Sequence, residues 1–158
     1  MPRTLKVATV WLVVGMLLFL AVQWWQRSQA AERFSTDGGT IELRRGPDGH
    51  YHWPGRVNGR RVDFLVDTGA TGIAIPAALA DELRLEPLGR VQSNTANGVA
   101  EGTVVRIDLE LDGGIRGERV RAVALPGLET RPLLGMAVLG RLRWTQQDGV
   151  LRIETASP

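Results

Sequence analysis

The chain has 158 residues, a length that suits one domain with an appendage. It contains no cysteine, which excludes disulfides, thiolate zinc sites and a cysteine nucleophile. Three of the 19 basic residues precede the first acidic residue, Glu32. The rest of the chain therefore carries 16 basic and 17 acidic residues, so the formal net charge of +2 comes from the N-terminal segment. The basic residues beyond it form no long run, which gives no sign of nucleic-acid binding.

The N-terminal segment over residues 7–25 is apolar except for one threonine and one glutamine. A helix needs about 20 apolar residues to cross the hydrocarbon core, so this segment is long enough to span a bilayer. A basic flank precedes it, and the pair Trp24-Trp25 suits an interfacial aromatic belt. We therefore interpret residues 1–26 as a membrane anchor and residues 27–39 as a tether. A signal peptide cleaved after Ala30 is the alternative, and both interpretations place the rest of the chain outside the cytoplasm.

From residue 40 onward the pattern is typical of β structure. Residues 40–44 alternate polar and apolar side chains, as a half-buried strand does. The next strand candidate, residues 50–57, is followed by Asn58-Gly59, a strong hairpin signal because both residues tolerate positive φ. The returning run, residues 61–66, leads directly into Asp67.

The second half of the domain continues this pattern with little helix. Pro76 followed by good helix formers predicts one short helix that ends near Leu83. Residues 91–98 are polar and predict a hairpin region. Alternation of polar and apolar side chains then predicts further strands at residues 103–111, 119–125 and 150–153. Many short strands separated by turn signals indicate an all-β domain over residues 40–158, a small closed barrel or a sandwich.

The run Asp67-Thr68-Gly69-Ala70-Thr71 is the main candidate for chemistry. An apolar strand, Phe64-Leu65-Val66, delivers a carboxylate to a loop of small residues. A carboxylate is costly at the end of a buried strand unless it is hydrogen-bonded or functional. Gly69 would let the backbone turn sharply and bring its N–H close to the acid. The alternative is a structural role, in which Asp67 caps the turn.

These residues resemble the active-site loop of aspartic proteases of the retropepsin and pepsin clan. Leu133-Leu134-Gly135 matches the clan's second signature, and Met136-Ala137-Val138-Leu139 resembles the short helix that follows it. Thr95 to Gly98 falls where the family has its flap, with Asn97 and Gly98 near the tip. Together with the N-terminal anchor, this order of motifs is similar to that of a bacterial group of membrane-anchored retropepsin-like proteases.

The resemblance implies a small closed retropepsin-like barrel with one or two short helices, which acts as an aspartic endopeptidase. Asp67 would be the catalytic carboxylate, Thr68 would hydrogen-bond across to a partner chain, and Gly69 would bring its backbone close to the reacting carboxylates. Leu133, Leu134 and Gly135 would support the loop from behind, with Ala70 and Thr71 completing it. The chemistry needs two carboxylates that share one proton, and neither a metal nor an organic cofactor.

The chain contains a single Asp-Thr-Gly, so the second carboxylate has to come from another chain. Asp63 falls within a predicted strand, and Asp112 and Asp148 fall in turns without the rest of the motif. We therefore predict a C2 homodimer with the site on its two-fold axis. Its substrates would be proteins or peptides on the periplasmic side of the inner membrane, to which each chain would be tethered.

Two other interpretations stay open. The barrel could be a non-catalytic dimerisation or peptide-binding module, although binding alone does not require the intact acid motif. An unrelated anchored β domain, such as an envelope scaffold, would make the motif a coincidence. His50 and His52 lie two residues apart on a predicted strand, as a pair of metal ligands could. No third ligand is evident, so we interpret both as exposed strand histidines.

Overall fold

The computed structural model describes residues 11–23, 33–36, 39–95, 98–128 and 131–155, and the chain divides into two compact units. The first unit, Met1–Ala31, contains a helix over residues 11–23 with exposed apolar side chains. Over the described ranges, none of the helices is long and apolar enough to cross a membrane. The predicted anchor, residues 1–26, and its apolar run, residues 7–25, both extend past the described helix at each end.

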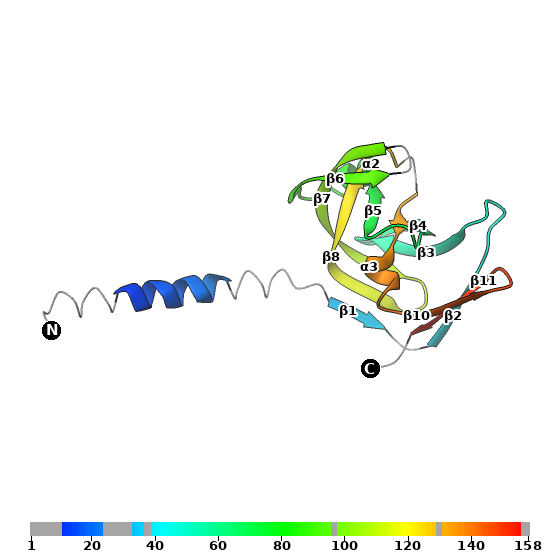
Figure 1. The fold of residues 1–158 in the computed structure, drawn as a ribbon, viewed down its shortest axis with the longest axis horizontal. Helices are drawn as coiled ribbons and strands as arrows, with labels where there is room; N and C mark the ends of the chain where they lie inside the picture. Colours follow the sequence, from blue (N-terminus) through cyan, green and yellow to red (C-terminus); the bar gives the residue numbers. More distant parts are fainter. Residues whose placement is uncertain (1–10, 24–32, 37–38, 96–97, 129–130, 156–158) are drawn as a thin grey trace, which may run out of the picture. The chain divides into compact units, whose positions relative to one another are not determined.

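The second unit, Glu32–Pro158, is built mainly from β-strands, with two short helices (Figure 1). Its elements in chain order are β1 (Arg33–Thr36), β2 (Gly39–Arg44), β3 (Tyr51–Val57), β4 (Arg60–Val66), β5 (Ile73–Pro76), α2 (Ala77–Glu82), β6 (Gly89–Thr95), β7 (Gly98–Leu111), β8 (Ile115–Leu125), β9 (Leu133–Leu134), α3 (Met136–Leu139), β10 (Arg143–Gln147) and β11 (Val150–Thr155).

The larger sheet closes on itself. Its strand order is β1-β8-β5-β9-β4-β3-β7-β6, and β8 also pairs with β7, so the six strands from β8 to β7 form a ring. β1 and β6 are attached outside this ring. Closure removes the unpaired edges of the ring strands. The prediction of a closed barrel with few short helices is therefore confirmed for this unit, and the sandwich alternative is not.

The barrel core is organised around the β3–β4 hairpin, which carries the loop of interest at its end. Trp53 and Phe64 face each other across the two strands and are both fully buried. The Trp53 Nε1–H donates a hydrogen bond of 2.8 Å to the Asp112 carbonyl, which satisfies the one polar atom of the side chain. Burial of each such aromatic side chain contributes roughly 1.5–3 kcal/mol, so the strand that leads to Asp67 is firmly held.

The hairpin turn predicted at Asn58-Gly59 is confirmed, with φ of 48° and 81° at the two residues. The short helix predicted after Pro76 is confirmed as α2, although Pro76 is its N-cap residue instead of its first helical one. Four strands were not predicted. β1 lies inside the segment predicted as a tether and pairs with β8. β5 and β9, of four and two residues, pair with each other in the ring. β10 joins β11 and β2 in a separate three-stranded sheet.

Candidate active site

The loop that carries Asp67 connects β4 to β5, and β9 lies between these two strands. Leu134 pairs with Val66 in parallel and with Ile73 in antiparallel fashion. The chain therefore leaves β4 at Asp67, turns, and returns on the other side of Leu134. The structure brings the two predicted motifs together, with Leu133-Leu134-Gly135 directly beside the Asp-Thr-Gly loop, as the resemblance implied.

Backbone hydrogen bonds fix this loop to the segment behind it. The Asp67 N–H donates to the Leu134 carbonyl at 3.0 Å. The N–H groups of Met136 and Ala137, at the start of α3, donate to the carbonyls of Ala70 and Thr71, both at 2.8 Å. Each end of the loop is thus tied to β9 or α3. Ala70 and Thr71 act here through their backbone atoms, a role that no side-chain pattern in the sequence indicates.

The Asp67 carboxylate is half-buried and is oriented from within its own loop. Its Oδ1 accepts a hydrogen bond of 2.8 Å from the Gly69 N–H, which is the only hydrogen bond that this side chain makes within the described ranges. A Cβ at position 69 would lie 3.2 Å from the same oxygen, so glycine leaves room for this close approach. Thr68 and Gly69 are exposed beside it. One carboxylate oxygen is therefore held while the other is left for a further partner.

Other carboxylates of the domain are engaged elsewhere. Asp63 Oδ2 lies 2.9 Å from His52 Nδ1, and Asp112 Oδ2 lies 2.9 Å from Arg61 Nη2. Asp148 lies in the β10–β11 turn with a φ of 50°. Among the residues that the structure describes, no second carboxylate is paired with the Asp67 loop.

The predicted flap corresponds to the β6–β7 hairpin, which extends the sheet outside the ring. Thr95 and Gly98 are the last pair of its register, and Asn97 lies outside the described residues. Gly98 has a φ of 104°, a conformation that strongly favours glycine. Val99 follows it with 66% of its surface exposed, an apolar side chain at the end of a long hairpin. The hairpin is confirmed, whereas its role as a flap stays a prediction.

The expectation of exposed strand histidines is wrong for His52. Its Nε2 lies 2.8 Å from Asp48 Oδ2 and its Nδ1 lies 2.9 Å from Asp63 Oδ2, and the side chain is only 23% exposed. Arg131, which precedes Pro132 and β9, adds a contact of 3.2 Å to Asp48 Oδ2. No group of His, Asp and Glu among the described residues could hold a metal ion. This cluster instead links the β3–β4 hairpin to the segment that enters β9.

The partners of Asp48 in this cluster shift its pKa. The hydrogen bond from the His50 N–H, followed by that of the His52 side chain, lowers the pKa of Asp48 from 3.8 to about 2. A carboxyl with a lowered folded-state pKa stabilises the fold above its unfolded pKa, and this contribution is lost as the pH falls through the folded value. We expect Asp48→Asn to lower the melting temperature slightly at pH 5, with the difference from wild type vanishing between about pH 4 and pH 2.

Thermal denaturation of the full chain, followed by circular dichroism over a pH series, measures this difference. Asp81→Asn is the matched control, because Asp81 is an exposed carboxylate on α2 outside the cluster. Identical pH profiles for the two variants would contradict a stabilising role of the Asp48 carboxylate.

Comparison with known proteins places this geometry in a family. The family model described as "gag-polyprotein putative aspartyl protease" matches residues 53–141. A protein encoded in the cobV 5′ region of Sinorhizobium sp is 33% identical over 110 residues, which cover 67% of this chain and 47% of that protein. The protein RP867 of Rickettsia prowazekii (strain Madrid E) is 31% identical over 129 residues, covering 77% of this chain and 53% of its own length. The chain thus spans about half the length of these curated relatives.

A solved structure supports the same assignment of the fold. The crystal structure of a retropepsin-like aspartic protease from Rickettsia conorii is similar, with a TM-score of 0.60 and 26% sequence identity. The match covers 80% of this chain and 98% of that chain, so nearly all of the solved protein has a counterpart here.

Proposed function

Because this chain belongs to the gag-polyprotein aspartyl protease family and has a retropepsin-like fold, we propose that it is an aspartic endopeptidase with Asp67 as its catalytic carboxylate. One observation carries the proposal: the Asp67 carboxylate is held at 2.8 Å by the Gly69 N–H, in a loop hydrogen-bonded to Leu134, with one oxygen left for a further partner. An aspartate that only caps the turn would need the hydrogen bond from the Gly69 N–H, but its loop would not need the hydrogen bond to Leu134.

The reaction follows from two such carboxylates facing each other. Like charges at close range cannot both ionise easily, so the pair shares one proton. The ionised carboxylate takes a proton from a bound water while the water oxygen attacks the scissile carbonyl carbon, and the protonated carboxyl gives its proton to the carbonyl oxygen. The tetrahedral intermediate then collapses: the carboxyl that took the water proton gives it to the departing amine as the C–N bond breaks, and the other carboxylate takes a proton from a hydroxyl of the intermediate, which restores the shared proton. Residues of this chain need only hold the carboxylates and the water.

The test is cleavage of an unbiased peptide library by the full chain at pH 3 to 8, roughly the range over which carboxylate pairs change protonation. Wild type should cut, and a variant without the Asp67 carboxylate should not. Absence of activity in a dimeric wild-type protein would favour the non-catalytic module instead.

The second carboxylate is proposed to come from a second copy of the chain in a C2 homodimer. Thr68 is exposed, and its hydroxyl has no partner within the described ranges, so it is available for a bond across the two-fold axis. Asp63 and Asp112 are poor candidates for the second carboxylate, because they pair with His52 and Arg61. A dimer interface would in addition bury apolar area in a chain that lacks disulfides.

Subunit mixing tests the dimer directly. If both Asp67 side chains are required, wild type refolded with an equal amount of Asp67→Asn chain is expected to keep about one quarter of the activity of the same total amount of wild type. Independent sites would keep about one half. The readout is the initial rate of peptide cleavage at fixed total protein concentration. Mixing without refolding, which leaves the homodimers intact, serves as the control.

The chain is further proposed to be a single-pass inner-membrane protein with its protease domain on the periplasmic side. The support is the apolar run over residues 7–25 with its basic flank and Trp24-Trp25. Tethering both copies to one membrane would raise their effective concentration for pairing. Release of the full chain from membranes by an alkaline carbonate wash would refute the anchor.

A further inference from the structure

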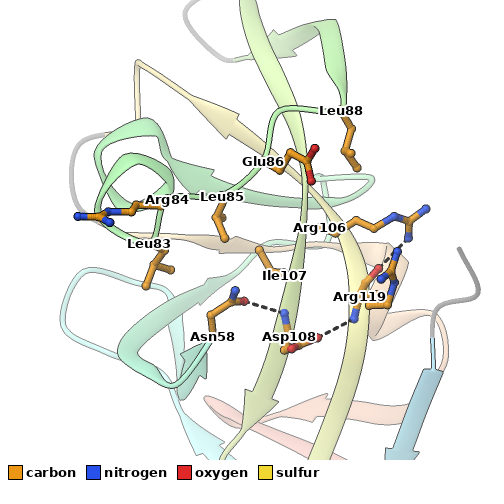
Figure 2. A pocket seen from close by; sticks show the side chains of 10 residues that line it. All are labelled: Asn58, Leu83, Arg84, Leu85, Glu86, Leu88, Arg106, Ile107, Asp108 and Arg119. Atoms are coloured by element: carbon orange, nitrogen blue, oxygen red, sulfur yellow. Dashed lines mark hydrogen bonds between the residues drawn. The ribbon is translucent and has the colours of Figure 1, made fainter. Parts of the chain in front are cut away.

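A cavity lies apart from the Asp67 loop. It has a volume of about 330 Å³ and is bordered by the turn before β4, the segment after α2, and the middle of β7 and β8 (Figure 2). Asn58 lines this cavity in the turn before β4, whereas Asp67 follows the last residue of that strand. A strand rises about 3.3 Å per residue, so the length of β4 puts about 20 Å between Asn58 and Asp67, and no residue of the Asp67 loop lines the cavity. The cavity is therefore separate from the proposed catalytic site.

Two arginines of neighbouring strands meet at one end of this cavity. Arg106 of β7 donates from Nη1 to the backbone carbonyl of Arg119 of β8 at 2.8 Å. Figure 2 shows the two side chains close together, whereas Arg84 points away from them. Within the described ranges, neither guanidinium forms an ion pair with a carboxylate. Arg106 is also half-buried, which strengthens any charge-assisted bond that it makes. Arg119 is exposed, and two adjacent guanidinium groups can together bind an anion.

The backbone beneath Arg119 is rigidly held. Asp108 lies at the bulge where the β7–β8 register shifts between Ile107 and Leu109. Its Oδ1 accepts from the Arg119 N–H, and its own N–H donates to Asn58 Oδ1, both at 2.8 Å. Arg119 has a φ of 54°, a left-handed conformation that is strained for an ordinary residue and unstrained for glycine. The network thus presents the Arg119 side chain from a fixed position, which lowers the entropic cost of binding.

The other charges of the cavity favour an anion of low charge. The Asp108 carboxylate is bonded to the backbone, and Glu86 is the second acid in the lining. These two negative charges would repel a doubly charged phosphate more than a single carboxylate. Leu83, Leu85 and Ile107 contribute apolar surface to the same cavity. A carboxylate carried next to an aliphatic group therefore matches both parts of the lining.

We propose that this cavity binds a peptide carboxylate, with Arg106 and Arg119 as its donors and the leucine side chains as the wall for a neighbouring aliphatic residue. The carboxylate is that of an acidic side chain or of a free C-terminus, which share the same chemistry. The site does not involve Asp67, so it stands whether or not the chain is a protease.

Fluorescence anisotropy tests the proposal on the full chain in detergent, with Asp67→Asn present so that no probe is cut. Three probes that carry the fluorophore on the N-terminal glycine amine separate the sources: a Gly-Glu-Leu amide, a Gly-Gln-Leu free acid and a Gly-Gln-Leu amide. We expect one or both acids to bind, the neutral amide not to bind, and added acetate to displace the bound probe. Equal affinity for the acidic and neutral probes would overturn the proposal.

The decisive variant is Arg119→Gly, because glycine suits the φ of 54° and removes the guanidinium without straining the bulge. It is expected to weaken acid binding about tenfold, with no loss of melting temperature. Arg116→Gln is the matched control: it removes one positive charge from the same strand, at an exposed residue outside the cavity lining. If both variants weaken binding equally, the attraction is only that of the general surface charge and the proposed site is refuted.

Discussion

Asp67→Asn is expected to abolish peptide-bond cleavage while leaving the fold intact. The amide oxygen that this substitution introduces can still accept the hydrogen bond that the Gly69 N–H makes to Oδ1, so the loop keeps its geometry. An amide, however, cannot take a proton from water, and loss of general acid–base catalysis alone lowers a rate by about 10²–10⁴-fold. Since both halves of the proposed homodimer would carry the change, we expect the loss at the upper end of this range. Initial rates on the best library substrate measure it.

Asp112→Asn provides the control for this substitution. It makes the same chemical change at an exposed carboxylate that pairs with Arg61, and it is expected to keep near-wild-type rates. Melting temperatures of all three proteins show whether a lost rate reflects lost structure. Equal cleavage by wild type and Asp67→Asn would show that Asp67 is not the catalytic acid.

The sequence was informative where one short segment determines its own conformation. Asn58-Gly59 adopts the predicted turn because positive φ at both positions is a local property. The pairing of the Asp67 loop with Leu134 was foreseen only through the resemblance, since the two segments are far apart in the chain. The catalytic role of Asp67 remains a prediction from the same source.

What the sequence could not indicate depends on contacts between distant segments. Strand β1 has four residues, too few for an alternation signal, and is defined by its pairing with β8. His52 looked exposed because its partner Asp63 lies on the neighbouring strand and its other neighbour, Asp48, lies in a turn. The meeting of Arg106 with Arg119 likewise depends on the β7–β8 register. Each of these features is a product of the sheet and not of a local pattern.

Gly135→Ala is expected to be the most disruptive single-methyl change in the proposed site. Gly135 is buried between β9 and α3, and a Cβ there would collide with the carbonyl oxygens of Ala70 and Gly72. The Ala70 oxygen already accepts the Met136 N–H, so relief of the clash requires the loop to move away from α3. Overpacking of this kind costs about 1–3 kcal/mol, and here the obstacle is backbone, which yields less than a side chain.

The same clash predicts a loss of activity beyond the loss of stability, because the displaced loop is the one that holds Asp67. Gly72→Ala is the matched control: it adds the same methyl group to the same loop, where no described atom lies within 4 Å of the new Cβ. Urea denaturation should give Gly72→Ala a free energy of unfolding within about 0.5 kcal/mol of wild type. Under conditions where both variants are folded, Gly135→Ala should cleave peptides more slowly than Gly72→Ala. If Gly135→Ala matched Gly72→Ala in stability and in rate, the segment behind the loop would be a neighbour of Asp67 and not its support.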